Sequence, residues 1–197
     1  MLLTSSQEEE LAPTDIPFSP NAIGIGIGMG TSAYAQGTLA ALLRTFPNVP
    51  FVIDADALNL VASSEDLQRA LPKNAILTPH PKELERLIGK WSDDLDRQAK
   101  AKEFAKKHKI ILVLKGAFTM ITDGDHFWVN STGNPALATA GSGDVLTGVI
   151  TGLLSQGYTP LNAAIVGVYI HGKAADTYVR NTKKNTMIAS DIIDFLS

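Results

Sequence analysis

The sequence has no cysteine, little net charge and no long apolar run. Without cysteine, a disulfide framework, a thiolate metal site and a cysteine nucleophile are excluded, and a reducing compartment is compatible with the chain. With 17 Lys and Arg against 20 Asp and Glu, and a net charge of −3, no broad nucleic-acid footprint is expected. No apolar run approaches the roughly 18–20 residues of a membrane span, and the first residues carry acids where a secretory signal would place basic side chains. We therefore expect a cytoplasmic protein with no nucleic-acid or membrane partner.

What the sequence does contain is an alternation of short apolar runs with amphipathic segments. Its 197 residues suit a single domain, residues 1–197, in which residues 1–21 are expected to be an irregular lead-in. Strands are predicted at 22–27, 49–53, 75–77 and 110–114, and a hairpin at 118–122 and 126–131 around Asp123-Gly124. Helices are predicted at 31–44, 63–71, 81–88, 92–108, 142–156, 160–180 and 190–196. This order predicts an α/β fold with a mostly parallel sheet and helices on both of its faces.

The strongest chemical signal is the helix start Gly141-Ser142-Gly143-Asp144. The backbone N–H groups of a Gly-Ser-Gly turn that opens a helix converge on an anion, and the helix dipole adds to the attraction. An apolar stripe at 3.6-residue spacing supports the helix; its members are Val145, Leu146, Val149, Ile150, Leu153 and Leu154. Asp144 could take a proton from a hydroxyl beside this anion site. Alternatively, Asp144 could do no more than cap the helix, and the motif alone does not favour either role over the other.

Further polar segments follow the predicted strands. Residues 115–119 and 78–81 lie at the carboxyl ends of strands, where open α/β sheets bind ligands. Taken alone, Lys115 could be an ordinary solvated lysine and His80 a surface residue. Asp54 and Asp56 could orient a metal or a water, or simply cap the next turn. Because these segments converge on one edge of the sheet, we expect them to form one ligand site.

A run of alternating glycines, at positions 24, 26, 28 and 30, invites comparison with a dinucleotide fingerprint. Its spacing is not G-x-G-x-x-G, and no helix starts at its third glycine. Rossmann-type dinucleotide binding is therefore disfavoured.

Taken together, the polar segments resemble a known family, the ADP/ATP-dependent NAD(P)H-hydrate dehydratases of the ribokinase-like superfamily. The resemblance runs from about residue 22 to residue 180 and is carried by residues 52–59, 78–84, 115–119 and 133–148. The combination of Thr-Pro-His-Pro-x-Glu with Gly-Asn-Pro-x-x-Ala-Thr-x-Gly-Ser-Gly-Asp-Val-Leu-Thr-Gly is specific to that family. It implies a ribokinase-like three-layer sandwich. It also implies removal of water from hydrated NADH or NADPH, driven by ATP or ADP, through phosphorylation of the hydroxyl and elimination of phosphate.

The resemblance also implies roles for individual residues. Asp144 would be the base that activates the hydroxyl, and the anion hole would be formed by Gly141, Ser142 and Gly143. The hydrated dinucleotide would be held by Gly30, His80 and Asp144. The adenine nucleotide would be held by a second set of residues: Lys115, Gly116, Ala117, Phe118, Thr119 and Gly143. Nucleotide use implies Mg²⁺, with Glu83 or Asp54 as candidate ligands.

The sequence departs from the family pattern in two places. The loop that usually reads Gly-Pro-Gly-Leu-Gly is here Gly-Ile-Gly-Met-Gly, at residues 26–30. The family domain also usually has a longer stretch before this loop, so we expect an N-terminally truncated sandwich, or a homo-oligomer in which another subunit completes the sheet. Two alternative functions stay open: a small-molecule kinase of the same superfamily, acting on a sugar or a vitamin, and a protein that binds nucleotide without turnover.

Overall fold

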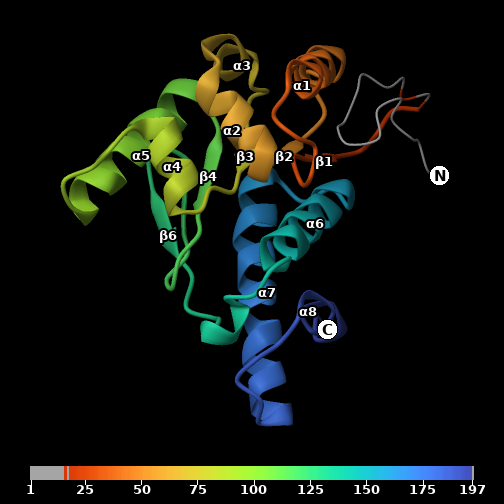
Figure 1. Cartoon of the computed structure of the whole chain (residues 1–197), viewed down its shortest axis with the longest axis vertical. Coiled ribbons are helices and arrows are strands. Elements are labelled where there is room, and N and C mark those ends of the chain that lie inside the picture. Colours follow the sequence, from red (N-terminus) through yellow and green to blue (C-terminus); the bar gives the residue numbers. More distant parts are fainter. Residues whose placement is uncertain (1–15, 17, 197) are drawn as a thin grey trace.

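The computed structural model describes residue 16 and residues 18–196, in which short strands alternate with helices (Figure 1). The strands are β1 (Ile23–Ile25), β2 (Phe51–Ile53), β3 (Ile76–Leu77), β4 (Ile111–Leu114), β5 (Met120–Thr122) and β6 (Phe127–Val129). The helices are α1 (Ala33–Thr45), α2 (Ala55–Ser63), α3 (Glu65–Ala70), α4 (Pro81–Ile88), α5 (Asp94–His108), α6 (Ser142–Ser155), α7 (Pro160–Thr182) and α8 (Ala189–Asp194). A short 3₁₀ helix, η1 (Pro135–Leu137), precedes α6.

The strands form one sheet in the order β1-β2-β3-β4-β5-β6. Strands β1 to β4 run parallel, with Val52 paired to Ile76 and Ile76 to Ile111, whereas β5 and β6 are antiparallel additions. The predicted parallel sheet with a terminal hairpin is therefore confirmed. Because parallel strands end at the same edge, the segments that follow β1 to β4 all emerge at what we call the carboxyl edge.

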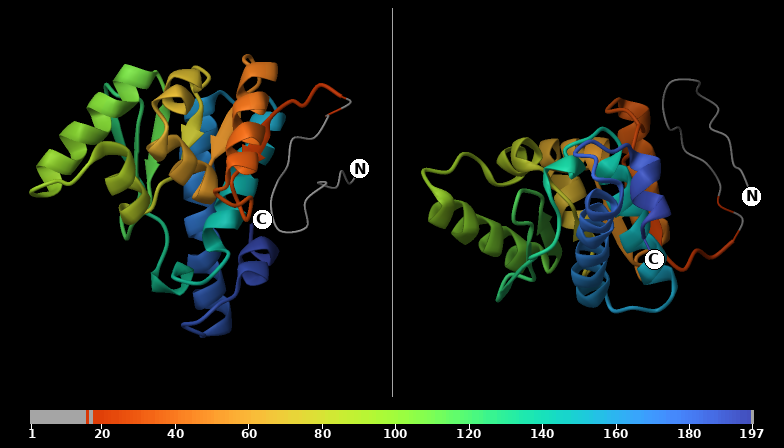
Figure 2. Two further views of the ribbon diagram at one scale, coloured as in Figure 1. Left: turned by 45° about the horizontal axis from the view of Figure 1, so that its top comes forward. Right: turned by 90° about the horizontal axis from the view of Figure 1, so that it is seen from below.

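Helices cover both faces of the sheet, because alternate residues of each strand point to opposite faces. Ile53, Leu77 and Leu112 belong to a core with α1 to α5. Their neighbours in the strands, Val52 and Ile76 among them, belong to a separate core with α6 and α7. The views in Figure 2 show these layers, and the three-layer α/β sandwich expected from the sequence is confirmed.

Helix α7 is 23 residues long. Figure 1 shows its C-terminal half extending beyond the strands, beside η1 and α8. A third apolar cluster joins these elements; its buried members are Ala136, Ala174, Ala175, Tyr178, Met187 and Ile192. Through this cluster, α7 is packed against the segment that leads into α6.

The predicted element bounds agree with the structure to within a few residues, with two omissions, of which one is the 3₁₀ helix η1. Helix α2 was not predicted, although Ala57, Leu58 and Val61 give it a buried face. The short helix expected at 63–71 is the separate α3, which begins after its N-cap Ser64. Of the expected lead-in, residues 1–15 and 17 lie outside the described part of the chain. Within the described part, no helix is long and apolar enough to cross a membrane.

Candidate functional site

A buried carboxylate stands at the centre of the carboxyl edge. Asp54 follows β2 directly and is 2% exposed. Its Oδ1 accepts from the N–H of Ala55 at 2.9 Å, which caps α2, and from the Lys115 ammonium at 2.8 Å. Its Oδ2 accepts from the Thr147 hydroxyl at 2.8 Å. The residues that follow β2 and β4 and the second turn of α6 are thus tied together through one side chain.

A second buried carboxylate, Glu83 in α4, lies beside this ion pair. Its Oε2 accepts from the backbone N–H of His80 at 2.7 Å and lies 3.9 Å from Lys115 Nζ. Glu83 is the third helical residue after the N-cap, and Pro81 is the first, so the sequence builds a capping box here. The single ammonium of Lys115 therefore faces two buried carboxylates. Lys115 is thus not an ordinary solvated lysine.

The glycine-led start of α6 faces Lys115. A Cβ placed on Gly143 would lie 3.5 Å from Lys115 Nζ and 3.7 Å from Asp54 Oδ2. Among the described residues, no side chain caps α6, and its N-cap, Gly141, has φ +81°, a left-handed conformation that favours glycine. The N–H of Ser142 donates to the Thr139 carbonyl at 3.3 Å, whereas the N–H groups of Gly143 and Asp144 have no acceptor among the described residues. These two groups are therefore left for an external acceptor, beside a lysine ammonium. The predicted anion hole and the predicted nucleotide-binding lysine lie at one place.

Asp144 is exposed and lies in the first turn of α6. A Cβ on Gly141 would come within 4.0 Å of Asp144 Oδ2, so the carboxylate lies over the glycine turn. Among residues 18–196, its oxygens accept no backbone N–H, and the N-cap of α6 is Gly141. The alternative in which Asp144 only caps the helix is therefore not what this structure shows.

His80 is held as a helix cap. Its Nδ1 accepts from the N–H groups of Lys82 at 3.1 Å and Glu83 at 3.4 Å. Since Nδ1 acts as an acceptor, the proton of the neutral ring is assigned to Nε2, which lies 3.3 Å from Glu83 Oε1. The imidazole is thus fixed in orientation beside Glu83, with about half of its side chain exposed.

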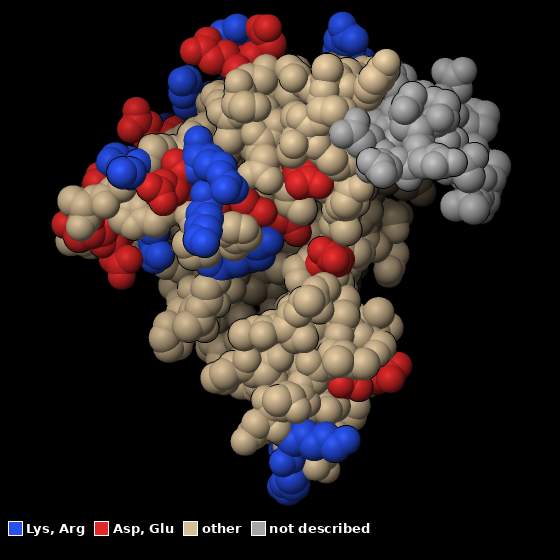
Figure 3. Space-filling view, viewed as in Figure 1, with Lys and Arg blue, Asp and Glu red and all other residues tan. Residues whose placement is uncertain are grey.

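The two remaining predicted segments border the same network. The N–H of Gly30 donates to Asp56 Oδ2 at 3.0 Å, so this glycine offers no free donor, and a Cβ on Gly26 would collide with the Asp54 carbonyl. In the 115–119 loop, the Thr119 hydroxyl donates to the Gly116 carbonyl at 3.2 Å. Phe118 projects from this loop with 74% of its surface exposed. In Figure 3, charged side chains border a hollow in the middle of the displayed face.

Neither candidate metal ligand is free. Both oxygens of Asp54 already accept hydrogen bonds, one of them from an ammonium that would repel a cation, and Glu83 holds both the backbone and the ring of His80. Within the described residues, no group of three or more histidine or acidic side chains could hold a metal. The structure therefore does not support Asp54 or Glu83 as ligands of a resident ion.

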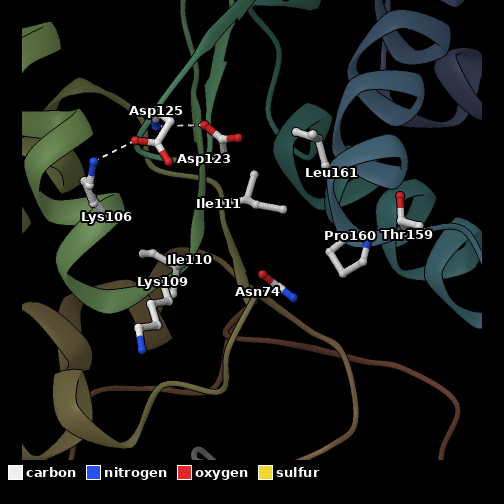
Figure 4. Close-up of a pocket in the computed structure, with 10 residues that line it drawn as sticks. All are labelled: Asn74, Lys106, Lys109, Ile110, Ile111, Asp123, Asp125, Thr159, Pro160 and Leu161. Carbon is white, nitrogen blue, oxygen red and sulfur yellow. Dashed lines mark hydrogen bonds and ion pairs between the residues drawn. The ribbon is translucent and has the colours of Figure 1, made fainter.

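A groove of about 610 Å³ opens at the opposite, amino end of β4. Figure 4 shows Lys106 paired with Asp125 on one side of it, and the start of α7 at Thr159 and Pro160 on the other. None of the predicted site residues lines this groove, so it is separate from the site at the carboxyl edge.

Three polar residues of the region were not singled out from the sequence. Thr147 donates to Asp54, while His171 and Asp176 in α7 contact the chain that leads into α6. Asp144 and Thr147 are separated by three residues and so lie on one face of α6, which is the one local signal that could have indicated Thr147. No local signal distinguishes His171 or Asp176 within the long helix.

A three-layer α/β sandwich with an uncapped, glycine-led helix facing a lysine at the carboxyl edge defines a ribokinase-like protein. A solved ribokinase-like superfamily protein from Enterococcus faecalis is 29% identical, with a TM-score of 0.74 over 89% of this chain and 61% of that one. The sequence profile of the NAD(P)H-hydrate dehydratase family matches residues 6–197. The chain belongs to the NAD(P)H-hydrate dehydratase family.

Individual relatives support this assignment. The ADP-dependent (S)-NAD(P)H-hydrate dehydratase of Neisseria meningitidis is 44% identical over 162 residues, which are 79% of this chain and 54% of that protein. The bifunctional NAD(P)H-hydrate repair enzyme Nnr of Moorella thermoacetica is 40% identical over 95% of this chain and 35% of its own length. The Bacillus subtilis ADP/ATP-dependent NAD(P)H-hydrate dehydratase, co-crystallised with ATP/Mg²⁺, is 34% identical with a TM-score of 0.75, over 94% of this chain and 65% of that one. The chain thus spans between 35% and 65% of the length of these relatives.

Proposed function

We propose that this chain catalyses the nucleotide-dependent dehydration of hydrated NADH or NADPH. The observation that carries the proposal is the meeting of Lys115, the open amides at the start of α6 and the exposed carboxylate of Asp144 at one edge of the sheet. The cation and the amides suit a terminal phosphate, and the carboxylate suits the proton of an attacking hydroxyl. Membership of the family supplies the substrate class.

In the proposed reaction, the hydroxyl oxygen of the hydrated nicotinamide ring attacks the terminal phosphorus of ATP or ADP. The bond between that phosphorus and the bridging oxygen breaks, and the hydroxyl proton passes to Asp144. The open amide of Gly143, with Lys115, would stabilise the charge of the transferring phosphoryl group. Inorganic phosphate then leaves from one ring carbon, the neighbouring carbon loses a proton, and the double bond of the dihydronicotinamide is restored.

The residues around Lys115 fit a nucleotide better than they fit a resident metal. The absence of a side chain at Gly143 leaves open the space next to Lys115 Nζ. The exposed Phe118 and the loop 115–119 border the same region and would hold the base and sugar. Mg²⁺ would enter with the phosphates, which it commonly accompanies while keeping several of its waters.

The test is to incubate the chain with hydrated NADH, ADP or ATP and Mg²⁺ and to follow the absorbance of the dihydronicotinamide. We expect the absorbance to return with the wild-type chain. Asp144→Asn should lower turnover by at least about a hundredfold, the usual contribution of a general base, while nucleotide still binds. Asp94→Asn is the matched control, because Asp94 is also an exposed acid in the first turn of a helix, far along the chain in α5. A folded wild-type chain that restores no absorbance would refute the proposal.

The same assay separates the alternatives. A small-molecule kinase would leave a stable phosphorylated product, and a silent nucleotide-binding protein would bind ADP in calorimetry without any turnover. The substrate-binding roles of Gly30 and His80 are part of this proposal, as are a cytoplasmic location and a homo-oligomeric state. Size-exclusion chromatography with light scattering would test the oligomer.

A further inference from the structure

Helix α7 holds both ends of the segment that runs from residue 133 to residue 142. At the first end, Asp176 Oδ2 accepts from the N–H of Gly133 at 2.8 Å, and its Oδ1 accepts from the side-chain amide of Asn134 at 3.0 Å. At the second end, His171 Nε2 lies 3.0 Å from the carbonyl oxygen of Ser142 and 3.4 Å from its hydroxyl. His171 and Asp176 are five residues apart on one helix, about 7.5 Å along its axis.

The chain between these ends also lies against α7. Asn134 Oδ1 accepts from the N–H of Ala136 at 2.9 Å, which caps η1, and Ala136 is buried in the cluster with α7 and α8. Just before the segment, the Thr132 hydroxyl donates to the Tyr169 carbonyl at 2.9 Å. A Cβ on Gly172 would collide with Thr132, so glycine is required at that position of α7 for the close approach.

The hydrogen bond of His171 has a defined direction. A carbonyl oxygen can only accept, so the ring proton is assigned to Nε2, which donates to Ser142. His171 is 8% exposed, and this burial lowers its pKa, so the ring stays neutral around pH 7. The proposed mechanism gives this histidine no role at the reacting atoms.

We propose that His171 and Asp176 are positioning residues that fix the 133–142 segment, and through it the N–H groups of the anion hole, in the orientation that receives the nucleotide phosphates. The inference rests on the proposed function, since it takes the start of α6 as the phosphate site. Preformed donors stabilise charge only when their own positions are held by further contacts. Glycine-rich backbone is costly to order, so contacts from a packed helix lower the entropy that ligand binding would otherwise lose.

The test compares pairs of variants of the full chain. His171→Leu removes the donor, whereas His171→Gln keeps an N–H in reach of the Ser142 carbonyl. Asp176→Leu removes both acceptors, whereas Asp176→Asn keeps one. We expect each Leu variant to weaken ADP binding in calorimetry by about tenfold. This is the change in affinity that corresponds to the loss of one buried hydrogen bond. The Gln and Asn variants should recover most of that loss. Hydrogen exchange of amides 133–144, measured without ligand, should be faster in the Leu variants than in the wild type. In His171→Gln the exchange rate should return toward the wild-type rate.

His108→Leu is the matched control, because His108 is a partly buried histidine of α5 that contacts the Gln68 carbonyl, outside the site. It should lower thermal stability while leaving ADP affinity and the exchange of amides 133–144 unchanged. The proposal is overturned if His171→Leu binds ADP as the wild type does, if His171→Gln is no better than His171→Leu, or if the exchange of amides 133–144 does not change. If the wild-type chain neither binds ADP nor restores dihydronicotinamide absorbance, the proposed function fails, and the exchange comparison alone decides whether α7 positions the segment.

Discussion

Gly143 offers a substitution in which stability and binding should move in opposite directions. Its φ lies outside the left-handed region, and a Cβ would meet Lys115 Nζ at 3.5 Å and Asp54 Oδ2 at 3.7 Å, which are ordinary van der Waals distances. Gly143→Ala should therefore fold without strain. Because alanine is favoured over glycine in a helix by roughly 0.5–1 kcal/mol, the variant should unfold at a midpoint higher by about 1–4 °C.

The same methyl group should exclude a phosphate from the amides of α6. It would occupy the space between the helix start and the lysine ammonium, where the proposed anion sits. We expect ADP affinity to fall at least tenfold, a cost of about 1.4 kcal/mol. Thermal unfolding and calorimetry with ADP measure the two effects on one protein preparation.

Gly152→Ala is the matched control for this prediction. Gly152 lies in α6 as well, and a Cβ there would meet no described residue within 4 Å. It should raise the midpoint by a similar amount and leave ADP affinity unchanged. If Gly143→Ala bound ADP as tightly as the wild type, the assignment of the phosphate to this helix start would be wrong. If it unfolded at a lower midpoint, the steric reasoning would be wrong instead.

Two further predictions concern buried ionisable groups. Lys115→Met leaves the buried carboxylate of Asp54 without its cation, and it should destabilise the fold by about 3–5 kcal/mol; an unchanged midpoint in urea unfolding would show that the pair contributes nothing. Burial lowers the pKa of His171 and of His108 in the folded state. Histidines of the unfolded chain have pKa values of about 6.5, so the unfolded chain binds more protons than the folded chain as the pH falls. The free energy of unfolding should therefore be at its full value above pH ~7 and decline from there toward pH ~5. His171→Gln should make that decline shallower in thermal melts taken across this range, and an unchanged slope would contradict the assignment to His171.

Much of the fold could be predicted from local patterns. The continuous apolar run of β4 and the Asp123-Gly124 turn depend on neighbouring residues only, and the structure confirms both. Helix α2 was missed because the acids after β2 were read as the end of a strand. The alternative that these acids cap the next turn is confirmed for Asp54, which accepts a hydrogen bond from the N–H of Ala55. The turn that Asp54 caps is the start of α2.

The candidate site was predictable in its members but not in its contacts. That Lys115, His80 and the α6 start would share one edge follows from parallel strands ending together. That Glu83 would join His80 to Lys115, rather than bind a metal, depends on side-chain geometry that no spacing specifies. Likewise, nothing in the local sequence of α7 indicates that His171 would reach the Ser142 carbonyl.

The sequence by itself determined which segments become strands and helices and which residue types stand where the strands end. Hydrophobic periodicity, turn chemistry and helix capping act over a few residues, so they can be read along the chain. Only the tertiary structure decided the partners: Asp54 meets Lys115 across 61 residues of chain and Thr147 across 93. The physical reason is that the sheet register and the packing of α6 and α7 bring these side chains together, and such long-range contacts arise from the whole core rather than from any local pattern.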